Sequence, residues 1–135
     1  MFEFTTKIRV RYGETDQMGY VYYGNYAEFY EVARVEMMRS LGMTYKSMED
    51  QGVMMPVIEL LCKYLKPALY DQEISIRVFI TEMPRARMHF KYELTNEAGE
   101  LINTGETLLV FVNMKTNRIC FIPAELANKL KPYFK

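Results

Sequence analysis

The sequence predicts an α+β fold in which one long helix lies against an antiparallel sheet of five to six strands. The first observation is the segment Tyr26–Leu41, where apolar residues recur at helical spacing. The second is the region after Gly52, where short segments alternate apolar and polar residues, as strands with one buried face do. Turn-forming residues such as those of Asn96–Gly99 separate these segments, which favours hairpins and hence antiparallel pairing.

We expect the helix to begin at Asn25, which suits an N-cap, with Glu28 three residues later as a loose capping-box partner. Gly42 is expected to end it. Its apolar residues cover so much of the circumference that something larger than one neighbouring element must surround it. The other expected elements are strands at Phe4–Tyr12, Val53–Leu65, Ile74–Ile80, Arg87–Leu94, Leu108–Val112 and Arg118–Ile122, and short helices at Tyr45–Glu49 and Ala124–Leu130.

Length and composition indicate one soluble domain spanning residues 1–135. The 17 basic residues balance the 17 acidic ones, which argues against a nucleic-acid partner. No apolar run is long enough for membrane insertion, and the N-terminal MFEFTTKIRV lacks the apolar region of a signal peptide, so we expect a cytoplasmic protein. Cys62 and Cys120 lie far apart in apolar segments and are expected to be free thiols. We expect no metal site and, because no dinucleotide or phosphate-loop motif occurs, no bound cofactor.

The loop between the first strand and the helix contains Asp16, the main candidate for a catalytic residue. An Asp in such a loop is most often a turn former that bonds its own backbone. Two features favour a catalytic role. Tyrosines crowd the same stretch and can shield a carboxylate from water, and the helix start offers free N–H groups for an oxyanion. These tyrosines are Tyr20, Tyr22, Tyr23 and Tyr26. The residues alone leave both interpretations open.

A carboxylate beside an oxyanion hole suits a thioester substrate. Thiols have a pKa of about 8.5, so a thiolate leaves without being protonated and no dedicated general acid is required. The other candidates are weaker. His89 belongs to the polar face of its strand, and no Ser lies in a nucleophile-elbow motif. Glu31 is placed to pair with Arg34 on the helix. Scattered basic residues either are solvated or gather across a subunit boundary to bind phosphates: Lys63, Lys66, Arg85, Arg87 and Lys115.

The stretch VRYGETDQMGYVYYGNYAEFYEVAR resembles the 4-hydroxybenzoyl-CoA thioesterase-like branch of the hotdog-fold acyl-CoA thioesterases. The shared pattern is R-x-x-E-T-D-x-x-G-x-V-Y-[HY]-x-N-Y followed by F-x-x-A-R. A looser similarity continues through PVIELLCKYLKPALYD, with its apolar strand and P-A-x-x-x-D ending.

This resemblance implies a hotdog fold whose active sites lie at the interface of a homodimer, often paired again into a homotetramer. It implies that Asp16 is the nucleophile or the general base, and that amides at the helix start, near Tyr23, polarise the thioester oxygen. Many members have His where this chain has Tyr23. The resulting prediction places Asp16 and Tyr23 in catalysis and Gly24, Asn25 and Tyr26 in substrate binding, with an acyl-CoA as the small-molecule partner.

Three functional hypotheses follow. The first is hydrolysis of acyl-CoA thioesters to free acid and CoA. The second is a hydratase or dehydratase on the same fold, which the absence of His near the central helix disfavours. The third is a non-catalytic module that binds acyl-CoA or acyl carrier protein.

Overall fold

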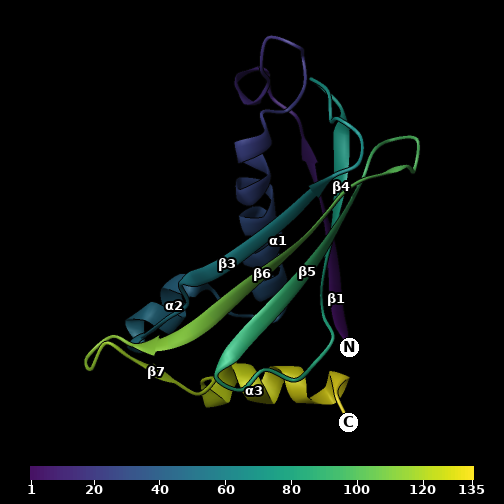
Figure 1. Ribbon diagram of the computed structural model, residues 1–135. Coiled ribbons are helices and arrows are strands. Elements are labelled where there is room, and N and C mark those ends of the chain that lie inside the picture. The colour runs from purple at the N-terminus through teal and green to yellow at the C-terminus, as the bar shows by residue number, and fades with distance from the viewer.

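The helix α1 (Tyr26–Ser40) lies across one face of a curled antiparallel sheet in the computed structural model, which describes all 135 residues (Figure 1). Five long strands form the sheet in the order β1-β4-β5-β6-β3, and two short strands, β2 and β7, both pair with β6. The strands are β1 (Phe2–Arg9), β2 (Val53–Met54), β3 (Val57–Tyr64), β4 (Glu73–Ile80), β5 (Arg87–Thr95), β6 (Leu101–Asn113) and β7 (Arg118–Cys120). The predicted α+β architecture is confirmed.

Alternation along the strands sets which face of the sheet meets the helix. In β4 the four aliphatic residues Ile74, Ile76, Val78 and Ile80 are buried, whereas the residues between them are partly exposed. Successive side chains of a strand point to opposite faces, so this pattern directs one complete apolar face toward α1. The hairpin between β5 and β6 is held by Asn96, whose Oδ1 accepts from the N–H groups of Ala98 and Glu100, both at 3.0 Å.

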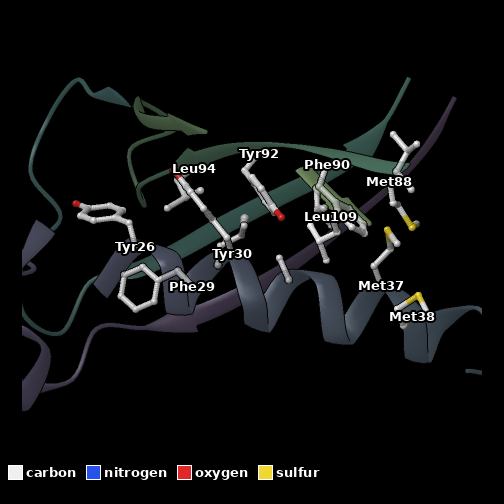
Figure 2. Packing of buried hydrophobic residues seen from close by; sticks show 14 of the residues in the cluster. Tyr26, Phe29, Tyr30, Met37, Met38, Met88, Phe90, Tyr92, Leu94 and Leu109 are labelled. Atoms are coloured by element: carbon white, nitrogen blue, oxygen red, sulfur yellow. The ribbon is translucent and has the colours of Figure 1, made fainter. Parts of the chain in front are cut away.

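The buried face of α1 supplies the other half of the core (Figure 2). Its buried residues are Tyr26, Phe29, Tyr30, Ala33, Arg34, Met37 and Met38. Val32 of the same helix is 41% exposed and lies outside this buried face. Leu41 ends the helix, and Gly42 follows with φ +78°, a conformation that favours glycine.

A hydrogen-bonded network lies inside this core. Tyr30 and Tyr92 stack with ring centroids 4.2 Å apart, and the Tyr30 hydroxyl contacts both Asn103 and the Cys62 sulfur. Arg34 is only 6% exposed and donates to the hydroxyls of Tyr92 (3.0 Å) and Tyr45 (3.2 Å). The predicted Glu31–Arg34 pair is therefore wrong. The guanidinium turns inward, where tyrosine hydroxyls satisfy it.

Several strand boundaries differ from the prediction: β1 ends at Arg9 rather than Tyr12, and β6 begins at Leu101 rather than Leu108. The expected strand Val53–Leu65 is split into β2 and β3 because Pro56, which has no N–H to donate, lies between them. Both short helices are confirmed as α2 (Tyr45–Asp50) and α3 (Ala124–Leu130).

The two cysteines are free thiols, as predicted.

The two ends of the chain meet beside α3 (Figure 1), where the N-terminal amine donates to the Tyr133 carbonyl at 2.6 Å. None of the helices is both long enough and apolar enough to cross a membrane.

Candidate active site

A pocket of about 300 Å³ opens where the loop after β1 meets the end of β3. This volume is at the lower end of the range for small-molecule sites. Seven of its ten lining residues are hydrophobic, and Asp16 supplies its carboxylate. The lining consists of Asp16, Met18, Tyr20, Val21, Tyr23, Tyr26, Tyr64, Leu65, Lys66 and Pro67. An apolar pocket with few polar groups is the usual form of a small-molecule binding site.

Asp16 is held in a tight turn of the β1–α1 connection. Its Oδ1 accepts from the N–H groups of Met18 (2.9 Å) and Tyr20 (3.2 Å), and its own N–H donates to the Tyr20 carbonyl at 2.8 Å. The turn-forming interpretation of Asp16 is therefore confirmed, and its catalytic role stays a prediction. One carboxylate oxygen of Asp16, Oδ1, holds the turn together. The other oxygen, Oδ2, makes no hydrogen bond within the protein, and the turn fixes its orientation.

The helix start faces the same region. The 3₁₀ turn Tyr23–Asn25 leads directly into α1, and its first intrahelical bond runs from the Asn25 N–H to the Tyr22 carbonyl at 2.9 Å. The N–H groups of Tyr23 and Gly24 precede that bond, so they have no acceptor within the turn. The Tyr22 ring leaves no room for a side chain at Gly24, since a Cβ there would lie 2.8 Å from Cε2 of that ring.

One carbonyl joins the Asp16 loop to the helix start. Glu14 C=O accepts from the Tyr22 N–H at 2.8 Å and from Asn25 Nδ2 at 2.9 Å. Asn25 occupies the N-cap position of α1, as predicted, but the expected capping box with Glu28 does not form. Asn25 has helical φ and ψ of −78° and −14° and makes no capping bond, because the preceding 3₁₀ turn extends the helical conformation past it. Its amide instead joins the helix start to Glu14, two residues before Asp16, and its substrate-binding role stays a prediction.

The predicted tyrosine shield is open on one side. Tyr26 is 3% exposed, and burial raises the pKa of its hydroxyl, whereas Tyr20, Tyr22 and Tyr23 are exposed. The Tyr23 ring lies against Tyr22, with centroids 4.7 Å apart. Tyr64, which the sequence patterns did not single out, joins these rings from β3 and packs edge-on against Tyr26 at 5.2 Å. It is 41 residues from Tyr23 in the chain, so no local spacing indicates the contact.

The other candidate residues lie elsewhere. His89 is on the outer face of β5, 3.4 Å from Glu106 and outside the pocket lining. Of the five basic residues considered for phosphates, only Lys66 lines the pocket, where it pairs with Glu100. No three His, Cys, Asp or Glu side chains come together in a way that would hold a metal ion.

A long helix wrapped by a curled antiparallel sheet is the arrangement of the hotdog fold. The family comparison agrees. The chain belongs to the thioesterase-like superfamily, whose family model matches residues 10–130.

Similar proteins cover most of the chain. The putative acyl-CoA thioesterase YneP of Bacillus subtilis is 39% identical over 95 residues, which cover 70% of this chain and 69% of YneP. The acyl-CoA thioester hydrolase YbgC of Escherichia coli is 30% identical over 128 residues, covering 95% of this chain and 96% of YbgC. Among solved structures, the DHNA-CoA thioesterase of Staphylococcus aureus superimposes with a TM-score of 0.84 at 38% identity, covering 99% of this chain and 85% of that one.

Proposed function

We propose that this protein hydrolyses acyl-CoA thioesters to the free acid and CoA, with Asp16 as nucleophile or general base. Family membership and the named acyl-CoA thioesterases at 30–39% identity support the reaction. The observation that carries the residue assignment is geometric. Asp16 and the start of α1 share one pocket, and the Glu14 carbonyl ties the two together.

In the proposed reaction the acyl chain occupies the apolar pocket, and its thioester carbon lies beside Asp16 Oδ2. The carboxylate attacks that carbon, or removes a proton from a water molecule that attacks it. The N–H groups of Tyr23 and Gly24 bind the oxyanion as it forms. CoA thiolate then leaves unprotonated, because the pKa of a thiol is much lower than that of an alcohol. In the nucleophilic route the acyl group stays on Asp16 as a mixed anhydride, which a water molecule hydrolyses to the free acid and the regenerated carboxylate. Tyr26 contributes to substrate binding through its buried ring, which forms part of the pocket wall.

The test of the reaction is a panel of acyl-CoA thioesters followed by release of free thiol. We expect release with at least one short-chain or aromatic acyl group at a rate well above spontaneous hydrolysis. A double-bond hydration assay on enoyl-CoA substrates runs in parallel. Hydration without thiol release would replace the proposal with the hydratase hypothesis, and tight acyl-CoA binding without either reaction would favour a binding module.

We also propose that the working unit is a homodimer, or a homotetramer of two such dimers, assembled through β3. This strand pairs only with β6, and its apolar residues are about half exposed on both faces. An exposed apolar edge strand is rare in a monomer, because its unpaired backbone groups and side chains invite pairing. The exposed apolar residues of β3 are Val57, Ile58, Leu60, Leu61 and Tyr64. Because β3 ends at the pocket, a second copy paired there completes each active site.

The cytoplasmic location of the protein stays a prediction.

Leu60→Lys is expected to weaken this assembly. Leu60 is 50% exposed in the isolated chain, so the substitution leaves the fold intact but places a charge in the proposed interface. Light scattering should show a wild-type mass that is a multiple of 16.0 kDa and a shift of the variant toward 16.0 kDa. Val32→Lys, on the exposed side of α1, is the matched control and should keep the wild-type mass. A wild-type protein that is monomeric at all concentrations would contradict the proposal.

A further inference from the structure

We propose that Tyr64 is a positioning residue for the oxyanion-binding turn, an inference that rests on the proposed function. Its hydroxyl donates a 3.0 Å hydrogen bond to the backbone carbonyl of Tyr23. Tyr64 is the last residue of β3, and Tyr23 is the first residue of the 3₁₀ turn that precedes α1. This bond therefore joins the edge strand to the turn that carries the proposed oxyanion donors.

The hydrogen bond from Tyr64 also affects the Gly24 N–H, because of the geometry of the peptide unit. The Tyr23 carbonyl and the Gly24 N–H belong to one planar peptide unit, so a bond that holds the carbonyl also fixes the direction of the N–H. Donation to a carbonyl polarises the peptide as well, which makes its N–H a stronger donor. Both effects favour an oxyanion, because a donor stabilises the transition state most when it is already oriented before the charge develops.

The phenol of Tyr64 is itself held in place. Its ring packs edge-on against Tyr26, with centroids 5.2 Å apart, and against Tyr23 at 6.5 Å. Desolvation and the neighbouring Cys62 thiol raise the pKa of the Tyr64 hydroxyl, which therefore remains protonated and able to donate throughout the neutral range. Tyr64 also lines the same pocket as Asp16, so the residue that holds the turn lies beside the proposed reacting atoms.

The first test reads the hydrogen bond without reference to activity. Labelling the protein with ¹³C at tyrosine carbonyls and ¹⁵N at glycine selects the only two Tyr–Gly peptides, Tyr12–Gly13 and Tyr23–Gly24. In Tyr64→Phe, the Tyr23 carbonyl and Gly24 nitrogen resonances should move upfield as the carbonyl loses its donor. The Gly13 signal should stay in place as an internal control. An unmoved Gly24 signal would overturn the proposal.

The second test is kinetic. Tyr64→Phe keeps the ring and removes only the hydroxyl, so we expect kcat to fall about tenfold, less than the 10²–10³-fold typical of removing an oxyanion donor outright. KM and the affinity for a non-hydrolysable thioether analogue should change less than about twofold. Tyr133→Phe is the control, because Tyr133 stacks on Phe2 beside the chain termini, outside the pocket. An unchanged kcat, or a loss confined to KM, would overturn the positioning role. A wild type without thiol release would refute the proposed function, whereas the Gly24 resonance still decides whether Tyr64 holds the turn.

Discussion

Asp16→Asn will lower kcat for thioester hydrolysis by about 10²–10⁴-fold, the range that loss of a general base produces, while the protein keeps its fold. The structure explains why activity is lost while the fold is kept. The Asn side-chain carbonyl can accept the same two hydrogen bonds that Oδ1 receives from the N–H groups of Met18 and Tyr20. The turn is thereby preserved, and only the basic, negatively charged oxygen that remains free of these bonds is lost.

The measurement is steady-state thiol release together with thermal unfolding of each variant. Asp50→Asn serves as the matched control, because Asp50 is an exposed carboxylate on α2 that pairs with Lys46 at 3.3 Å. Surface pairs of this kind contribute little to stability, so this variant should retain wild-type activity and melting temperature. Full activity in Asp16→Asn would remove Asp16 from the mechanism.

Gly105→Ala will destabilise the fold by about 3–5 kcal/mol, since it combines overpacking with the loss of buried contacts. A Cβ at this position of β6 would lie 2.5 Å from Cε2 of Tyr30 and closer still to Cζ and the hydroxyl oxygen of the same residue. Gly105 is the cross-strand partner of Tyr92 on β5 and of Cys62 on β3. The space that it leaves admits the Tyr30 ring, which stacks on Tyr92 and contacts the Cys62 sulfur.

Denaturant unfolding measures this loss, and a second background identifies its cause. Gly13→Ala is the control, because no atom lies within 4 Å of a Cβ at that glycine. In a Tyr30→Leu background the ring is gone, so the further cost of Gly105→Ala should fall to within about 1 kcal/mol, as expected when one substitution removes the partner of the other. An equal cost in both backgrounds would show that the Tyr30 contact is not the cause.

Much of the fold was predictable from the sequence because its signals are local. The alternation of β4 and the helical spacing from Tyr26 to Met37 depend only on residues a few positions apart. The errors arose where a distant partner decides the outcome. Arg34 could pair with Glu31 on the helix surface, but Tyr92 and Tyr45 hold it inside the core. Asn25 has the residue type of an N-cap, but its amide reaches back to Glu14.

The candidate site likewise has a part that local sequence patterns predict and a part that depends on residues far apart in the chain. Asp16 and the helix start are ten or fewer residues apart in one motif, and the sequence by itself determined that they lie near each other. It also determined the α+β class and the family, since both are carried by patterns within single segments. Only the tertiary structure decided that Tyr64 holds the Tyr23 carbonyl and that Gly105 makes room for Tyr30. The physical reason is chain separation. These contacts join residues that come together only when the sheet wraps around α1, and no local spacing carries a signal of that approach.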